Sequence, residues 1–189
     1  MIYGDRIRLR AVEKEDLPEF VRWLNDPEVR QGLNLYLPLS AADEEDWFQQ
    51  QRKLDPEERA LAIEVQTESD SEWHFIGNCG YLNLNWRDRS AEIGILIGDK
   101  KFWNRGYGTK AVKLLLRHGF QTLNLHRLWL RVFDSNQRAI RVYHKAGFVP
   151  EGTFRQAHYQ DGQYQDVQIM SVLHGEWKEQ QKKERQDAS

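Results

Sequence analysis

The sequence predicts an α/β (α+β) fold, with a mixed, mostly antiparallel sheet of about seven strands flanked by about four helices. Runs that alternate apolar and polar residues are interspersed with segments whose apolar residues recur at helical spacing. The helical segments carry start and stop signals, such as acids in the first turn and glycine after the last. Near the C-terminus, Asp161-Gly162 lies between two strand-like runs, which is a strong signal for a tight hairpin.

The N-terminal half contains strands, two helices and a loop. Residues 3–12 alternate as an edge or half-buried strand, and residues 13–24 form a helix that Asn25-Asp26-Pro27 ends. Ser40 is a candidate N-cap for a second helix. Three strands are then expected over residues 61–67, 75–84 and 91–97.

The C-terminal half begins with a glycine-containing turn and a helix that extends to about residue 122. A strand over residues 127–133 precedes a short helix over residues 136–146, and Gly147 is the expected left-handed C-terminal position of that helix. The hairpin strands are expected over residues 148–158 and 164–173.

The composition is that of a single globular domain, because 40% of the 189 residues are hydrophobic and 30% are charged. Residues 1–175 are expected to form this domain, and the polar residues 176–189 a C-terminal tail or frayed helix. The net charge of −2 offers no general attraction to nucleic acid. The sequence has no apolar run long enough for a membrane span or signal peptide, and Cys79 is its single cysteine. A cytoplasmic protein with an inert, buried Cys79 is expected.

The most informative segment is Trp103-Asn104-Arg105-Gly106-Tyr107-Gly108-Thr109, which follows a strand-like run and opens an amphipathic helix. A glycine-bracketed turn at a helix start presents unpaired backbone N–H groups and the positive end of the helix dipole. Such a turn binds phosphate or pyrophosphate without needing a particular side chain. A phosphorylated cofactor is therefore expected.

A dinucleotide is one candidate for this cofactor. Gly106-x-Gly108-x-x-Ala111 fits the dinucleotide pattern, and Asp134 lies where a ribose-binding acid would be found. Residues 98–105 separate the preceding strand from the first glycine, however, and no second βαβ half follows Asp134. The P-loop pattern is absent, which removes the simplest NTPase interpretation.

Further motifs occur in order after the turn: Asn136 to Phe148, then Glu151-Gly152, then Tyr164-Gln165-Asp166. With these motifs the stretch from Glu92 to Leu173 resembles the GNAT family of N-acetyltransferases, which transfer acetyl from acetyl-CoA to an amine. Residues 5–10 and 23–29 look like the subgroup with ribosomal-protein N-terminal acetyltransferases and bacterial spermidine acetyltransferases. The pattern departs at Trp103, where the family often has Gln or Arg.

The resemblance implies that acetyl-CoA is the cofactor. Its pyrophosphate is expected on the backbone of residues 104–109, with the Arg105 side chain as an extra charge. Its pantetheine arm is expected along the strand at residues 95–97. Asn136, Ala139 and Tyr143 share one helix face that would meet the cofactor. The implied cofactor-binding residues are Ile95, Leu96, Ile97, Trp103, Asn104, Arg105, Gly106, Tyr107, Gly108, Thr109, Asn136, Ala139 and Tyr143.

Two side chains are candidates for catalysis. By resemblance, the Tyr143 hydroxyl approaches the thioester sulfur; the alternative is a core tyrosine whose hydroxyl bonds the backbone. Because a thiol has a pKa of about 8.5 and tyrosine about 10, full proton transfer is uphill by roughly 2 kcal/mol, which favours hydrogen-bond donation. Glu92 is the candidate base acting through water, and the alternative is an ion pair with a surface arginine. A backbone N–H near Leu96 is the candidate oxyanion donor.

The acceptor is expected to be a primary amine, on a small molecule or a peptide, that attacks the thioester directly. A polyamine such as spermidine is favoured, and a ribosomal protein N-terminus and an amino sugar or aminoglycoside stay open. The acidic run from Asp43 to Asp46 is a solvated helix start that could also attract a polycation. Asp166 either orients the amine or serves only the hairpin.

Other classes of function are also open. The chain could be a non-catalytic acyl-CoA-binding sensor, or an interaction module with no nucleotide site. The six histidines show no metal-ligand spacing with carboxylates or Cys79, so no metal is expected. Neither nucleic acid nor a membrane is an expected partner, and the resemblance implies a homodimer.

Overall fold

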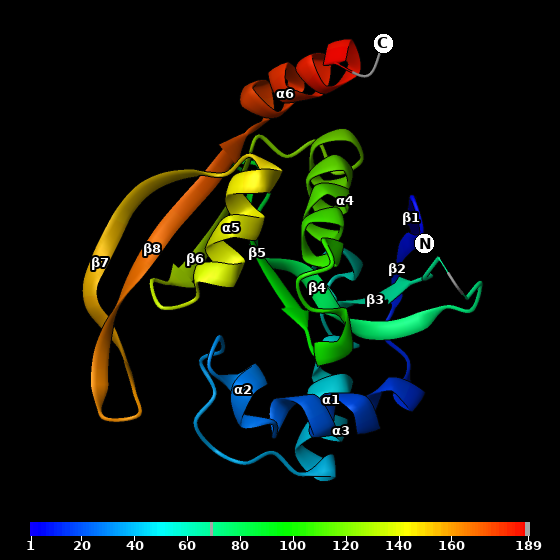
Figure 1. The fold of residues 1–189 in the computed structure, drawn as a ribbon, viewed down its shortest axis with the longest axis vertical. Helices are drawn as coiled ribbons and strands as arrows, with labels where there is room; N and C mark the ends of the chain where they lie inside the picture. The colour runs from blue at the N-terminus through cyan, green and yellow to red at the C-terminus, as the bar shows by residue number, and fades with distance from the viewer. Residues whose placement is uncertain (69, 188–189) are drawn as a thin grey trace. The chain divides into compact units, whose positions relative to one another are not determined.

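The structure is a computed structural model that describes residues 1–68 and 70–187 (Figure 1). Its eight strands follow the order β1-β2-β3-β4-β5-β6-β8-β7 in one sheet. The β5–β6 pair is parallel. The antiparallel pairs include β1–β2, β2–β3, β3–β4, β6–β8 and β7–β8. The predicted mixed, mostly antiparallel α/β fold is confirmed. The strands are β1 (Ile2–Gly4), β2 (Ile7–Ala11), β3 (Leu61–Val65), β4 (His74–Asn85), β5 (Ser90–Ile97), β6 (Arg127–Phe133), β7 (Val149–Gln160) and β8 (Gln163–Leu173).

The helices exceed the expected number, because a short helix follows Asp26 and a further helix lies at the C-terminal end of the described residues. The α-helices are α1 (Leu17–Leu24), α2 (Pro27–Arg30), α3 (Ala41–Gln51), α4 (Tyr107–Gln121), α5 (Gln137–Ala146) and α6 (His174–Asp187). The chain divides into two compact units. Unit 1 comprises Met1–Tyr81 and Gly94–Ala111, and unit 2 comprises Leu82–Ile93 and Val112–Ser189.

The first strand of unit 1 differs from the prediction. The sequence predicts one strand over residues 3–12, but β1 and β2 form a hairpin that turns at Asp5 and Arg6. Arg6 has a φ of 53°, in the left-handed region, and the Asp5 carboxylate accepts a hydrogen bond from Lys110 Nζ at 3.0 Å. This turn provides the eighth strand.

The helices of unit 1 form an aromatic core with the sheet. α1 buries Leu17, Phe20 and Trp23, and the ring of Phe20 lies 5.4 Å from that of Phe75 on β4. The predicted N-cap of α3 is confirmed, because Ser40 Oγ accepts the N–H of Asp43 at 3.2 Å. Its partner in the capping box is the Asp43 carboxylate, which accepts the N–H of Ser40 at 2.7 Å.

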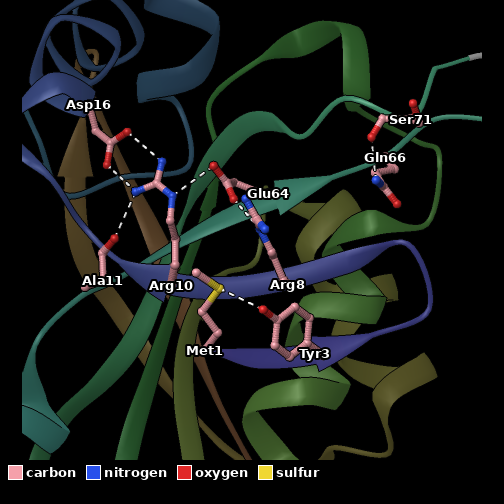
Figure 2. Close-up of polar contacts among 9 residues, drawn as sticks. All are labelled: Met1, Tyr3, Arg8, Arg10, Ala11, Asp16, Glu64, Gln66 and Ser71. Carbon is pink, nitrogen blue, oxygen red and sulfur yellow. Dashed lines mark hydrogen bonds and ion pairs between the residues drawn. The ribbon is translucent and has the colours of Figure 1, made fainter.

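Figure 2 shows a chain of charged residues that links β2, β3 and the start of α1. Arg10 donates two hydrogen bonds to Asp16, at 2.6 and 2.8 Å, and its Nε lies 2.9 Å from Glu64. Arg8 bonds the other oxygen of Glu64 and lies 4.2 Å from the ring centroid of Trp73. The two carboxylates are buried, and these ion pairs satisfy them.

The strands of unit 2 confirm the sequence patterns closely. β6 has the predicted bounds and pairs in parallel with β5 from Ser90–Arg127 to Glu92–Trp129. The long curved hairpin of β7 and β8 turns at Asp161 and Gly162, whose φ values are 51° and 83° (Figure 1). Gly147 ends α5 with a φ of 100°, as expected.

The segment predicted as a polar tail or frayed helix forms α6 as far as Asp187, and residues 188 and 189 lie outside the described residues. Its first turn is anchored, because Trp177 is buried and its ring lies 5.5 Å from that of Phe120. Cys79 on β4 is buried as predicted, and burial raises the pKa of its thiol, which makes it a poor nucleophile.

Candidate functional site

The turn that opens α4 has the backbone conformation of an anion-binding segment. Asn104 and Gly106 have φ values of 58° and 83°, and the N–H of Lys110 donates to the carbonyl of Gly106 at 3.1 Å. The amides of residues 107–109 therefore precede the first bond of the helix and have no acceptor within it. A Cβ on Gly106 would meet nothing within 4 Å, so the segment is open at this point. The turn precedes a helix as predicted, and the start of a helix is a place where backbone N–H groups can bind phosphate.

A 3₁₀ helix, Lys100–Phe102, lies between the end of β5 and this turn. A dinucleotide turn would begin directly after its strand. The intervening helix therefore agrees with the sequence argument against a dinucleotide site.

Trp103 fixes the turn to the end of β5. Its indole N–H donates to the carbonyl of Ile97 at 2.6 Å, and its half-buried ring packs against the aromatic core of α1 and α3. A tryptophan thus supplies a donor and packing surface where the resemblance expects Gln or Arg. The same bond uses one of the two acceptor positions of the Ile97 carbonyl, which lies in the strand where the pantetheine arm is expected.

The end of β5 lies directly against β4. A Cβ on Gly77 would overlap the carbonyl oxygen of Leu96, so the residue at position 77 must be glycine for the two strands to approach. The amides of Gly98 and Asp99 both donate to the carbonyl of Ile76, at 2.8 and 3.2 Å. Residues 95–97 are each partly exposed, and the Leu96 side chain packs against the core of α1.

The cationic side chains around the turn differ in whether they are paired. Lys110 lies 3.0 Å from Asp5, and Lys100 lies 2.7 Å from Asp26. These pairs lower the pKa of both aspartates. Arg105 is exposed, and no ion pair is recorded for it among the residues that the structure describes. Its guanidinium is therefore available to an anion.

In unit 2, Asn136 is the N-cap of α5. Its side-chain oxygen accepts the N–H of Ala139 at 3.1 Å. The resemblance implies only a cofactor contact for Asn136, although Asn at the start of a helix is also a common capping signal. The cap leaves the NH₂ group of Asn136 as the part that can bond a ligand.

Tyr143 lies on the same helix and is deeply buried, with 6% of its surface exposed. Its ring centroid is 5.8 Å from that of Phe148. The alternative role for Tyr143 is that of a core tyrosine whose hydroxyl bonds the backbone. Within residues 1–68 and 70–187, no such hydrogen bond of the hydroxyl is observed. Burial raises the pKa of Tyr143 to about 12. The hydroxyl is consequently a protonated donor throughout the physiological pH range.

The raised pKa makes proton transfer from Tyr143 less favourable than transfer from a tyrosine with the ordinary pKa of about 10. The difference between a pKa of about 12 and the pKa of a free thiol, about 8.5, corresponds to about 5 kcal/mol. Hydrogen-bond donation to a developing thiolate carries no such cost.

Glu92 is buried and lies within a set of fixed donors. Arg131 donates from Nε to Oε1 at 2.8 Å and from Nη2 to Oε2 at 3.1 Å, while Asn83 Nδ2 donates to Oε2 at 2.8 Å. The ion pair raises the pKa of Arg131. The structure therefore contains the arginine ion pair that the sequence analysis gave as the alternative to a base. No pattern in the sequence predicts that Asn83 and Arg131 contact Glu92.

Asp166 supports the backbone of the hairpin. Its carboxylate accepts the N–H of Gln156 at 2.8 Å, at a point where β7 shifts register and Gln156 has a φ of 51°. Its carbonyl accepts the N–H of Asp134 at 3.1 Å. Of the two roles considered for Asp166, orienting the amine or serving the hairpin, the contacts in the structure are those of the hairpin role.

Two further features of the described residues are relevant to function. They contain no group of three or more His, Cys, Asp or Glu placed to hold a metal ion. None of the helices in this part of the chain has the length and apolarity needed to cross a membrane.

The similarity of this sequence to known proteins extends over nearly the whole chain. An uncharacterized N-acetyltransferase of Bacillus licheniformis, p20, is 29% identical over 176 residues, which is 93% of this chain and 97% of that protein. The spermidine N(1)-acetyltransferase of Vibrio cholerae is 29% identical over 174 residues, or 92% of this chain and 96% of that protein.

The fold is likewise similar to that of solved structures. The crystal structure of the Vibrio cholerae spermidine N-acetyltransferase in complex with CoA and spermine has a TM-score of 0.80 at 27% identity, and covers 92% of this chain and 99% of that one. The family described as the acetyltransferase (GNAT) domain matches residues 6–149. The chain therefore belongs to the GNAT family of acetyltransferases, which use acetyl-CoA as the acetyl donor.

Proposed function

We propose that this GNAT enzyme acetylates a primary amine of a polyamine such as spermidine. The observation that carries the proposal is the open turn at Asn104–Thr109, because its conformation and free helix-start amides suit a diphosphate. The polyamine acceptor is supported by the similarity, over nearly the full length of both chains, to the Vibrio cholerae spermidine acetyltransferase. N-terminal acetylation of a ribosomal protein and acetylation of an amino sugar or aminoglycoside are the competing acceptor assignments.

The proposed binding contacts lie in both units, each considered by itself. In unit 1 the backbone of residues 104–109 binds the pyrophosphate of CoA, the Arg105 guanidinium adds charge, and the strand at residues 95–97 contacts the pantetheine arm. In unit 2 the NH₂ group of Asn136 is the proposed donor to the cofactor, and the small side chain of Ala139 leaves room for it. Acetyl-CoA supplies the acetyl group as an activated thioester.

The proposed chemistry assigns separate roles to Tyr143, Leu96 and Glu92. Tyr143 donates a hydrogen bond to the sulfur that leaves, and a backbone N–H near Leu96 stabilises the oxyanion that forms on direct attack. The acceptor ammonium, with an ordinary pKa near 10.4, must lose a proton before it attacks. Because Glu92 already accepts three hydrogen bonds, we assign this proton to water and give Glu92 a positioning role through Arg131.

Four further properties are proposed on the same basis. Residues 1–175 act as one catalytic domain, and the enzyme works in the cytoplasm, where acetyl-CoA is available. A homodimer is the proposed assembly, and the acceptor is a small molecule or peptide rather than nucleic acid or a membrane component.

The test is the release of CoA from acetyl-CoA with a panel of amines, comprising spermidine, spermine, a peptide with a free N-terminus and an aminoglycoside. The proposal predicts turnover with the polyamines at a kcat/KM well above that for the other amines. Higher kcat/KM for the peptide or the aminoglycoside would reassign the acceptor. Tight acetyl-CoA binding with no turnover would instead favour a sensor, and absence of CoA binding would favour an interaction module.

A further inference from the structure

The strand β7 leaves the register of β8 in the middle of the long hairpin. Between Phe154 and His158, four positions along β7 are matched by only two positions along β8. Within this bulge Gln156 has a φ of 51°, and its N–H donates to the Asp166 carboxylate at 2.8 Å. A bulge turns the side chain that follows it to a new direction, and bulges are common next to active sites. His158 is the side chain that β7 presents after this bulge.

The imidazole of His158 lies flat against the ring of Phe133, the last residue of β6. The two ring centroids are 3.9 Å apart, and the planes differ by 9°. The carbonyl of Phe133 accepts the N–H of Asn136 at 2.9 Å, and Asn136 is the N-cap of α5. The stack therefore holds the half-buried imidazole beside the start of α5, where the proposed donor to the cofactor lies.

Two further contacts hold the hairpin at the start of α5 (Figure 1). The N–H of Asp134 donates to the carbonyl of Asp166 at 3.1 Å. Ser135 Oγ donates to the side-chain oxygen of Gln165 at 2.5 Å. A long helical side chain extends back over the turn before its own Cα, so Tyr143 covers the N-terminal half of α5. The imidazole and the phenol that is proposed to bind the sulfur are therefore both directed to the same end of this helix.

One nitrogen of the His158 imidazole is open to a proton. Nε2 lies 3.3 Å from Oε1 of Gln160, and because an amide oxygen only accepts, Nε2 carries the hydrogen of the neutral ring. No hydrogen bond of Nδ1 is recorded in residues 1–68 and 70–187. The lone pair of Nδ1 is therefore available to a ligand or to a water molecule.

The imidazole has no charged partner among the residues that the structure describes. The charged and titratable side chains on the elements around it are those of Asp134, Arg155, Tyr159, Asp161, Tyr164 and Asp166. No ion pair between any of these and the imidazole is recorded in the described part of the chain. Imidazole changes its charge between pH 5 and pH 8, so a ring without a fixed counter-charge suits proton transfer near neutral pH.

We propose that His158 is a further acid–base residue of the reaction, which takes a proton from the acceptor nitrogen after that nitrogen has attacked the thioester. This inference rests on the function proposed above, and it holds for any primary amine acceptor. The first proton of the ammonium is lost to water before the attack. The attack then leaves the nitrogen with a positive charge and two hydrogens, and Nδ1 of His158 accepts one of them as a proton, directly or through one water.

The proton passes from nitrogen to His158 and finally to sulfur. The nitrogen lone pair forms the N–C bond, and the π electrons of the carbonyl move to its oxygen and give the oxyanion. Once the imidazole has taken the proton, the oxyanion re-forms the carbonyl and the C–S bond breaks, with its electron pair on sulfur. The imidazolium returns the proton through solvent to the thiolate, which yields the thiol of CoA and restores the neutral imidazole.

The test is the pH dependence of kcat/KM in the wild type, in His158→Phe and in His144→Phe, with the amine of the panel above that reacts fastest. Phenylalanine keeps an aromatic ring on Phe133 and removes the proton acceptor, so a merely structural role survives in this variant. His144 is exposed on α5, and its variant is the matched control.

At pH 8 we expect the kcat/KM of His158→Phe to be about 100-fold below that of the wild type, a typical effect of losing a proton-transfer group. The difference should shrink to a few-fold by pH 5, because the wild-type imidazole is then protonated and accepts no proton. His144→Phe should match the wild type throughout. A loss that is the same at every pH, or no loss at pH 8, would overturn the inference.

His158→Ala provides a second measurement that does not depend on the folding of His158→Phe. The truncation leaves space beside Phe133 that free imidazole can occupy. Added imidazole should raise the kcat of His158→Ala at least about fivefold at pH 8, because it restores a proton acceptor, and should leave the kcat of the wild type unchanged. Absence of this rescue, in a variant with the wild-type thermal midpoint, would contradict the proposed role.

The same measurements separate this inference from the proposed function. If the wild type acetylates none of the amines in the panel, the proposed function is wrong and the role of His158 is wrong with it. If the wild type acetylates an amine and the ratio of wild type to His158→Phe does not change with pH, the proposed function stands and only the role of His158 is wrong.

Discussion

The indole of Trp103 donates its N–H to the carbonyl of Ile97 at 2.6 Å and thereby ties the candidate phosphate turn to the end of β5. The turn itself is held in shape by Asn104 and Gly106, both at positive φ. A turn fixed before ligand binding loses less conformational freedom on binding, which favours affinity.

Replacing Trp103 with phenylalanine should weaken CoA binding by about fivefold, because a lost hydrogen bond of this kind costs about 1 kcal/mol. The ring would still fill the core of α1 and α3, so the fold should persist. Calorimetric titration with CoA measures the effect. Trp86→Phe, at an exposed tryptophan in unit 2, is the matched control and should leave the Kd unchanged. Equal Kd values for wild type and Trp103→Phe would show that the bond does not preorganise the turn.

Tyr143→Phe should lower kcat by about 100-fold and leave the KM for acetyl-CoA nearly unchanged, because the hydroxyl acts on charge that develops during the reaction. Steady-state kinetics with acetyl-CoA varied at saturating amine measures both constants. An unchanged kcat would remove Tyr143 from the chemistry.

The pH profile of the wild type tests the state of Tyr143 separately. Burial raises its pKa to about 12, and a tyrosine is neutral below its pKa, so the donor should be intact at every pH up to about 10. The wild-type profile should therefore contain no basic limb that Tyr143→Phe removes. A limb near pH 10 that disappears in the variant would mean that the hydroxyl ionises in its ordinary range.

Glu92→Gln should keep the acidic limb of the wild-type pH–rate profile, because we assign the amine proton to water. It should also lower the free energy of unfolding by about 1 to 2 kcal/mol, since Arg131 and Asn83 lose a charged acceptor. Arg131 is half exposed, which limits this loss. Kinetics between pH 5 and pH 9 and urea unfolding provide the two measurements. Loss of the acidic limb in a folded variant would restore Glu92 as the base.

The ion pair of Glu151 and Arg127 should make stability depend on pH. Arg127 first, and then a hydrogen bond from Ser171, lowers the pKa of Glu151 from 4.5 to about 2. The folded pKa lies below the unfolded one, so the contribution is complete above about pH 4.5 and is lost as the pH falls toward 2. Because both side chains are partly exposed, the contribution is at most about 1 kcal/mol.

Urea unfolding of wild type and Glu151→Gln at pH 7 and pH 3 measures this dependence. The wild type should be the more stable protein at pH 7, and the difference should shrink at pH 3. A difference that grew toward pH 3 would contradict the assigned direction.

Local patterns predicted the elements that depend on residues close together in the sequence. The strand over residues 127–133, the turn at Asp161-Gly162 and the cap at Ser40 follow from periodicity, left-handed turn residues and capping chemistry. The split of the first strand at Arg6 was missed, because an arginine with positive φ has no such signal.

Contacts between distant residues were beyond the reach of these patterns. Glu92 and Arg131 meet because the parallel register of β5 and β6 places Glu92 opposite Trp129. The register depends on the whole sheet, so the ion pair could be named only as an alternative.

The backbone amides at the start of α4 are the feature on which the proposed function most depends. The most direct measurement is a crystal structure of the protein with CoA bound. We predict that pyrophosphate oxygens lie within hydrogen-bond distance of N–H groups of residues 104–109. A bound CoA whose pyrophosphate contacts none of these amides would contradict the account.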